Sequence, residues 1–182
     1  QMLVASYNGK VVRFPEDTVR PMGRTATGVR AIKLDEDGKD RVIGMICVEQ
    51  GSKDSVLVIS EKGFGKRTLL DDENGEPIYR ITNRGGKGVK TMNITDKTGN
   101  LIGLEAVNDD MDLMLITKAG TAIRMAMDAI SVLGRATQGV KLIELQKRND
   151  TLMFGCTVPK EEQEEVAESE EVTTEETTTT EE

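Results

Sequence analysis

One seven-residue pattern, R-x-x-x-G-V-K/R, occurs three times in the chain, and this repetition constrains the fold more than any other feature. The copies run from Arg24 to Arg30, from Arg84 to Lys90 and from Arg135 to Lys141. A unit that recurs cannot bury its apolar face alone, so neighbouring copies must pack against one another. The sequence therefore predicts a body built from stacked, equivalent units.

The pattern lies within a longer repeat that has the composition of β-strands and turns. Each repeat opens with an apolar strand, at residues 2–6, 56–60 and 113–117. A glycine soon after this strand is typical of a hairpin turn, and an arginine follows four residues after the glycine. The turn glycines are Gly9, Gly63 and Gly120, and the arginines that follow them are Arg13, Arg67 and Arg124.

Two further strands are expected in each repeat. Apolar residues alternate after the pattern, at 29–34, 89–94 and 140–145, as in half-buried strands. A polar turn then leads into a closing apolar run at 42–48, 101–107 and 152–158. Four strands in roughly 40 to 50 residues are typical of a propeller blade. We therefore expect an all-β, propeller-like fold of four-stranded antiparallel blades, with three repeats in an open arc, because a closed wheel needs about four to eight blades.

Composition divides the chain into four parts. We assign residues 1–51, 52–110 and 111–159 to three blade repeats, and residues 160–182 to an acidic tail. From Glu161 to Glu182 there are 11 acidic residues and no lysine or arginine, so we expect this tail to be disordered. All 24 basic residues and 21 acidic ones lie in residues 1–160, which carry a formal charge of +3 although the whole chain carries −8.

Composition also excludes several classes of site. The chain has no histidine, which excludes histidine-based acid–base catalysis, a Ser-His-Asp triad and histidine metal sites. Cys47 and Cys156 lack metal-ligand spacing, so we expect buried strand residues and no metal site. The glycine-rich stretches at 60–68 and 81–88 lack the first glycine and the Ser/Thr of a phosphate-binding loop, which argues against a nucleotide cofactor. No signal peptide or membrane-spanning stretch is evident, and a cytoplasmic location is the default expectation.

The recurring Arg/Gly elements allow a structural and a functional interpretation. For the glycines we favour structure, because Gly28, Gly88 and Gly139 can supply a backbone conformation that other residues resist. For the arginines we favour contact with phosphates, because a structural ion pair would carry its acid along, and no acidic residue recurs in register with the arginines of the pattern. The predicted phosphate contacts are Arg13, Arg24, Arg30, Lys66, Arg67, Arg84, Lys87, Lys90, Lys118, Arg124, Arg135 and Lys141.

The polymer that these cations contact is expected to be duplex DNA. Proteins that bind single strands stack the bases on aromatic side chains. This chain has only two tyrosines and three phenylalanines, and they do not recur in register. Equivalent cations on blades that fan around an axis line a curved track along which DNA would bend. We therefore expect sequence-tolerant wrapping through the phosphate backbone.

Several stretches carry a resemblance to a known family. They are Gly9–Phe14 (GKVVRF), Val19–Gly23 (VRPMG), Thr27–Arg30 (TGVR), Gly65–Thr68 (GKRT) and Gly134–Val140 (GRATQGV). Over residues 1–159 the chain closely resembles the C-terminal domain of the bacterial DNA gyrase A protein, which also has a similar acidic end. The resemblance implies a β-pinwheel, a propeller-like fold whose blades exchange strands, and a role in wrapping DNA for negative supercoiling.

The resemblance also implies what this segment contributes to a larger enzyme. The family's signature box, Q-R-R-G-G-K-G, belongs to the first blade. Here Arg84–Gly88 reproduces its last five residues, but Thr82 and Asn83 replace the opening Gln-Arg. The chain resembles the last three blades and the tail, a non-catalytic part of an ATP-hydrolysing type IIA topoisomerase. The implied partners are duplex DNA, the rest of the gyrase A protein and the gyrase B protein in an A2B2 assembly, while ATP and Mg belong to other parts of the enzyme.

Two other functions stay open from the sequence. The C-terminal domain of topoisomerase IV resembles the gyrase domain, but it usually has fewer or degenerate blades and no long acidic tail. A propeller-like scaffold would bind protein partners through its rim, without the steep salt dependence of DNA binding. The tail has two interpretations as well, since its carboxylates would either compete with DNA for the cations or serve only as a solubilising end.

Overall fold

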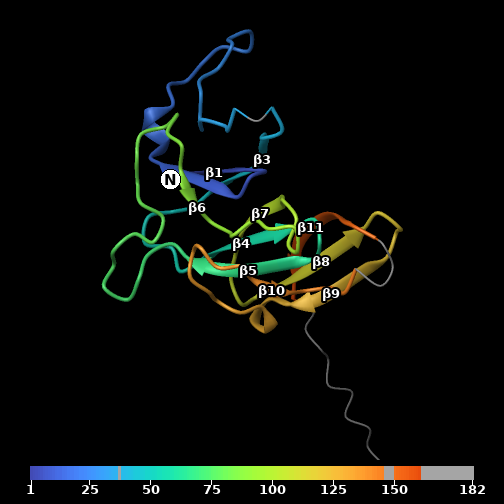
Figure 1. The fold of residues 1–182 in the computed structure, drawn as a ribbon. Coiled ribbons are helices and arrows are strands. Elements are labelled where there is room, and N and C mark those ends of the chain that lie inside the picture. The colour runs from blue at the N-terminus through green and yellow to red at the C-terminus, as the bar shows by residue number, and fades with distance from the viewer. Residues whose placement is uncertain (37, 146–149, 161–182) are drawn as a thin grey trace, which may run out of the picture.

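The computed structural model describes residues 1–36, 38–145 and 150–160, and its regular structure there is almost entirely β (Figure 1). The strands are β1 (Met2–Ser6), β2 (Lys10–Phe14), β3 (Val42–Cys47), β4 (Ser55–Ser60), β5 (Phe64–Leu69), β6 (Val89–Lys90), β7 (Leu101–Val107), β8 (Met111–Thr117), β9 (Ala122–Ala126), β10 (Val140–Lys141) and β11 (Leu152–Pro159). Two single 3-10 turns, η1 (Glu16–Thr18) and η2 (Met127–Ala129), are the only helical elements of the described residues. Neither is long and apolar enough to cross a membrane. The all-β prediction is confirmed, whereas the acidic segment 161–182 lies outside the described residues.

The strands form three antiparallel sheets that exchange strands along the chain. Their orders are β3-β1-β2-β6, β10-β5-β4-β7 and β11-β8-β9. In the first sheet, β6 comes from the second repeat, and it pairs with β2 through Val11 opposite Val89 and Lys10 opposite Lys90. In the second sheet, β10 comes from the third repeat and pairs with β5. Each of these two sheets is therefore completed by the R-x-x-x-G-V-K/R element of the next repeat.

Hairpins with glycine turns begin all three sheets. Gly9, Gly63 and Gly120 have φ values of 83°, 80° and 87°, in the left-handed region where a side chain is unfavourable. The amide of each glycine donates a 3.0 Å hydrogen bond to the carbonyl three residues earlier, on Ser6, Ser60 or Thr117. The same turn thus sets the register of the first two strands in every repeat.

The central strand β4 is buried on both faces, which explains its unbroken apolar sequence. Successive side chains of a strand point to opposite faces. Accordingly Val56 and Val58 pack in a core shared with the first sheet, and Leu57 and Ile59 pack in a core shared with the third. The closing strands β3, β7 and β11 also pack on one another in sequence. Three stacked blades with two shared cores result.

The predicted third strands are much shorter than the sequence indicates. Only residues 89–90 and 140–141 are strands, and residues 29–34 contribute a single bridge, between Ile32 and Gly86. The pairing of β6 ends because its partner β2 begins at Lys10, directly after the turn at Gly9. The alternation of apolar residues instead reflects packing on that turn, since a Cβ on Gly9 would lie 2.7 Å from Cγ1 of Ile94. The prediction of long third strands was wrong for this reason.

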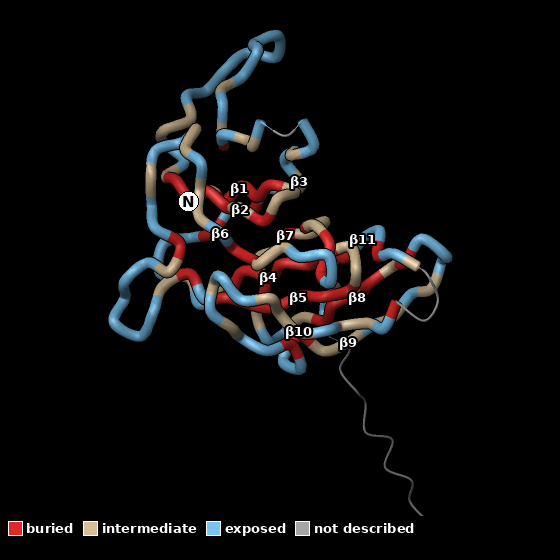
Figure 2. The backbone as a smooth tube through the Cα atoms, viewed as in Figure 1, coloured by how far each residue is buried: buried red, intermediate tan, exposed pale blue. Residues whose placement is uncertain are grey.

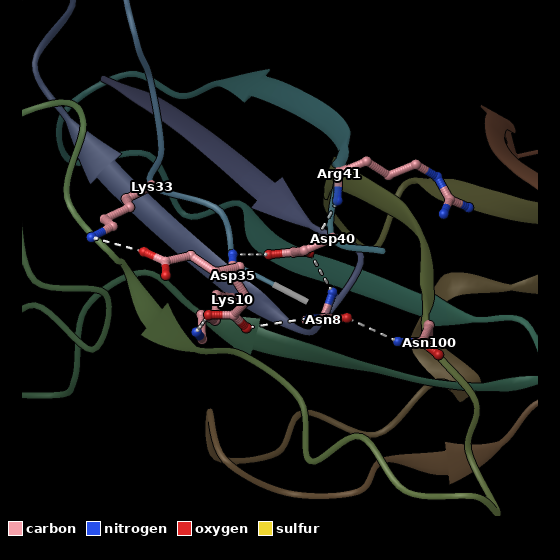
Figure 3. A network of polar contacts seen from close by, with 8 residues as sticks. Asn8, Lys10, Lys33, Asp35, Asp40, Arg41 and Asn100 are labelled. Carbon is pink, nitrogen blue, oxygen red and sulfur yellow. Dashed lines mark hydrogen bonds and ion pairs between the residues drawn. The ribbon is translucent and has the colours of Figure 1, made fainter. Parts of the chain in front are cut away.

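A network of polar side chains holds the turn between the first repeat's pattern and β3 (Figure 3). The Asn8 amide donates to Asp40 Oδ1 at 3.0 Å, and Asn8 Nδ2 donates to Asp35 Oδ2 at 3.3 Å. Lys10 forms an ion pair with Asp35. Asn100 Nδ2, from the second repeat, donates to Asn8 Oδ1 at 3.3 Å, so the network also joins two blades.

Candidate nucleic-acid interface

The glycine of each exchanged element passes close to the backbone of the preceding sheet. Gly88 has a φ of +71°, and a Cβ there would lie 2.5 Å from the carbonyl oxygen of Val11. Gly139 has a φ of +80°, and its Cβ would lie 2.8 Å from the carbonyl oxygen of Gly65, which is the residue equivalent to Val11. Gly28 has the same conformation, with a φ of +86°, but nothing within 4 Å. Close approach thus requires glycine at two of the three positions, and backbone conformation favours it at all three.

Successive pattern elements lie side by side and meet through equivalent hydrogen bonds. Arg84 Nη1 donates to the carbonyl of Arg30 at 3.5 Å, and Arg135 Nη1 donates to the carbonyl of Lys90 at 3.3 Å. Arg30 and Lys90 are the last residues of the preceding elements. The first arginine of one element therefore lies beside the last cation of the element before it. Two seams result, and each brings two positive side chains together.

These paired cations lack neutralising carboxylates within the described part of the chain. The ion pairs found there do not include Arg30, Arg84, Lys90 or Arg135. Arg30, Arg84 and Lys90 are exposed and Arg135 is half-buried, on loops that surround the buried strands (Figure 2). Like charges held together cost energy unless an anion is present, so each seam is suited to bind a phosphate. The absence of a partner acid for the pattern arginines agrees with the sequence-based argument.

The remaining exposed members of the predicted set are less concentrated. Arg24 and Lys87 are exposed on the first and second elements. Lys141, also exposed, forms a 2.6 Å ion pair with Glu144. Lys118 is exposed in the β8–β9 turn, where the equivalent residues of the other repeats are Tyr7 and Glu61, so its charge does not belong to a row.

The strand arginines have a different environment from the pattern arginines. Arg13 is 3% exposed, and it donates from Nε to Gln1 Oε1 at 2.6 Å and from Nη1 to the carbonyls of Leu70 and Tyr79. Its Nη1 also forms a 2.8 Å ion pair with Asp71. Arg13 therefore ties the first blade to the segment that leads into the second pattern element.

Arg67 makes the equivalent tie one blade further on. It is 8% exposed, its Nε donates to the carbonyl of Ile130 at 2.9 Å, and its Nη1 contacts Asp109 at 2.5 Å. Ile130 is in register with Tyr79, five residues before the pattern arginine in each case. The third member, Arg124, is exposed on β9 and is held by Asp112 at 2.8 Å and by the carbonyl of Pro159. These side chains hold blades together, so their availability to DNA differs from that of the seam cations.

Lys66 is the most deeply placed cation of the predicted set. It lies on β5 with no exposed surface. Burial lowers the pKa of its ammonium from 10.5 to about 8, and the nearby charge of Arg135 acts in the same direction. Lys66 is therefore still largely protonated at neutral pH, but it faces the protein interior and the third pattern element.

Two exposed arginines that the sequence-based analysis did not select lie next to the pattern. Arg20 and Arg80 each precede a pattern arginine by four residues, and Ser131 stands at this position in the third repeat. The spacing R-x-x-x-R, present in two of the three repeats, is the signal that could have identified them. They extend the cationic surface beyond the seams.

The site has the properties of a binding surface and not of a catalytic centre. Among the described residues no group of three or more Cys, Asp or Glu side chains could hold a metal ion. The two cysteines are free; Cys47 is exposed and Cys156 half-buried, so the prediction that both are buried was wrong. Cys47 lies on β3, a strand at the edge of its sheet, which leaves one of its faces open to solvent.

A family model described as the DNA gyrase C-terminal domain, beta-propeller, matches residues 1–49, 54–108 and 112–154. The chain belongs to this family. The A subunit of DNA gyrase from Staphylococcus aureus strain MRSA252 is 46% identical over 144 residues, which cover 79% of this chain and 15% of the relative. The same protein from strain NCTC 8325 gives the same values. The chain thus spans about 15% of the length of these curated relatives.

Solved structures agree with the family assignment. A DNA gyrase A C-terminal domain superposes with a TM-score of 0.73 and 25% identity, over 86% of this chain and 50% of that one. The C-terminal domain of DNA topoisomerase IV superposes with a TM-score of 0.76 at 18% identity, over 87% of this chain and 46% of that one. The second likeness shows the shared fold alone. The predicted pinwheel fold is confirmed by the first match together with the family model.

Proposed function

We propose that this chain binds and wraps duplex DNA around its cationic seams, with little dependence on sequence, as part of a gyrase A protein. The observation that carries this proposal is the equivalent pairing of unneutralised cations, Arg30 with Arg84 and Lys90 with Arg135. Their repetition from blade to blade provides phosphate contacts at regular intervals along a curved surface. Contacts of this kind position DNA without reading its bases.

The whole enzyme and its partners form the wider part of the proposal. The names of the relatives support a chain that acts within DNA gyrase, a topoisomerase that introduces negative supercoils. In that setting the partners are the rest of the gyrase A protein and the gyrase B protein, in a cytoplasmic A2B2 assembly that uses ATP elsewhere. The segment 161–182 would modulate wrapping by competing with DNA for the seam cations.

The test is the salt dependence of binding to random-sequence duplex DNA. Each lost phosphate contact lowers the slope of log K against log salt by about 0.9, so Arg84→Ala together with Arg135→Ala should lower it by about 2. Lys53→Ala removes an exposed lysine in the loop between β3 and β4, away from the seams, and serves as the matched control. Binding that is absent or insensitive to salt, or an equal loss in the control, would contradict the proposal and favour a protein-binding scaffold.

A further inference from the structure

Lys66 makes three hydrogen bonds, all to the third pattern element. Its Nζ donates to the carbonyl of Gly134 at 2.5 Å, to the carbonyl of Arg135 at 2.6 Å and to Thr137 Oγ1 at 3.0 Å. An ammonium group has three protons and no acceptor, so these three partners satisfy it completely. A fully buried cation thus holds, from below, the backbone from which Arg135 projects.

The equivalent position in the first blade shows what happens without this ammonium. Val12 stands there, one residue before Arg13, as Lys66 stands one residue before Arg67. Val12 is buried but has no side-chain donor, and a small cavity of about 70 Å³ lies between it and the second element, lined also by Gly86 and Gly88. The second element is held through main-chain bonds instead, from the amide of Lys33 to the carbonyl of Gly86 at 2.8 Å. The two seams therefore share geometry but differ in what fixes the arginine.

We propose that Lys66 is a positioning residue for DNA contact by Arg135. This inference rests on the proposed function. A charged donor bonded to the carbonyls of residues 134 and 135 restricts the peptide units on either side of the Arg135 Cα, and so restricts where its guanidinium can reach. The guanidinium then lies beside Lys90, whose carbonyl accepts its hydrogen bond. Lys66 itself does not contact DNA, because it has no exposed surface.

The decisive experiment is a double-mutant cycle on DNA affinity with the full 182-residue chain. Lys66→Met keeps the length of the side chain and removes the charge. We expect it to weaken binding to duplex DNA at 0.1 M salt by up to about eightfold, the effect of one phosphate contact with a slope of 0.9. In an Arg135→Ala background the same change should have no further effect, because the group that it positions is absent. In an Arg84→Ala background, which affects the other seam, its full effect should remain.

Amide hydrogen exchange supplies the structural readout. Lys66→Met should accelerate exchange at residues 134–139 and leave residues 83–88 unchanged. Should Lys66→Met fail to fold, Thr137→Val removes one acceptor of the ammonium from an exposed residue and leaves β5 intact. It should produce a smaller loss of DNA affinity that again disappears in the Arg135→Ala background.

The outcomes separate this inference from the proposed function. Additive effects of Lys66→Met and Arg135→Ala, or unchanged affinity in Lys66→Met, would overturn the positioning role while Arg84→Ala and Arg135→Ala still weaken binding. If neither Arg84→Ala nor Arg135→Ala changed the salt slope, the proposed function would fail first.

Discussion

Replacing Gly88 by alanine tests whether strand exchange holds the blades together. An L-residue in the left-handed region costs roughly 1–2 kcal/mol, and Gly88 has a φ of +71°. A Cβ there would also lie 2.5 Å from the Val11 carbonyl oxygen, a contact that the backbone must relieve. Such overpacking typically costs about 1–3 kcal/mol. We therefore expect Gly88→Ala to lower the free energy of unfolding by about 2–5 kcal/mol.

The chain contains its own control for this prediction. Gly28 occupies the same place in the first element, with a φ of +86°, but no atom lies within 4 Å of its Cβ position. Gly28→Ala should therefore cost only the conformational term, about 1–2 kcal/mol. Urea unfolding of the two variants, followed by circular dichroism, measures the difference. Equal losses in Gly28→Ala and Gly88→Ala would refute the view that the second element is seated on the first sheet.

Two further predictions concern the buried cations. Arg67→Met should lower the free energy of unfolding by about 1–3 kcal/mol, because it leaves the carbonyl of Ile130 without its donor, whereas Arg24→Ala, at an exposed residue, should change it by no more than about 0.5 kcal/mol; similar values in urea unfolding would contradict the internal role of Arg67. Between pH 8 and 10.5 the unfolded chain retains a proton on Lys66 that the folded chain has released, so stability should rise with pH across this window, by up to about 3 kcal/mol relative to Lys66→Met. Parallel pH profiles of the two proteins would show that Lys66 has an ordinary pKa.

The fold could be predicted from the sequence because its signals are local and repeated. A glycine after an apolar strand indicates the same hairpin three times, and the closing run Leu101–Val107 coincides with β7. The exchange of strands could not be derived from the residues, since Val89 and Lys90 look alike whether they pair with their own blade or with its neighbour. It followed only from the resemblance to the gyrase domain.

The cations show a similar division. Sequence places Arg13 and Arg84 in one class, because both recur in register. The structure separates them, because Arg13 lies within reach of Leu70 and Tyr79, residues more than fifty positions away. Lys66 was grouped with the surface cations for the same reason, since its three partners come from the next repeat. Periodicity identified which residues are equivalent, but only the contacts between blades distinguish an internal tie from an exposed charge.

The strand exchange has a consequence for the order in which the blades form on the ribosome. The first sheet needs β6, so it stays incomplete until synthesis has passed Lys90, by which time both β4 and β5 of the second sheet have been made. The second sheet in turn needs Lys141. Each blade is therefore left with an open edge until its successor has begun, and nascent chains would expose unpaired strand edges that invite mispairing.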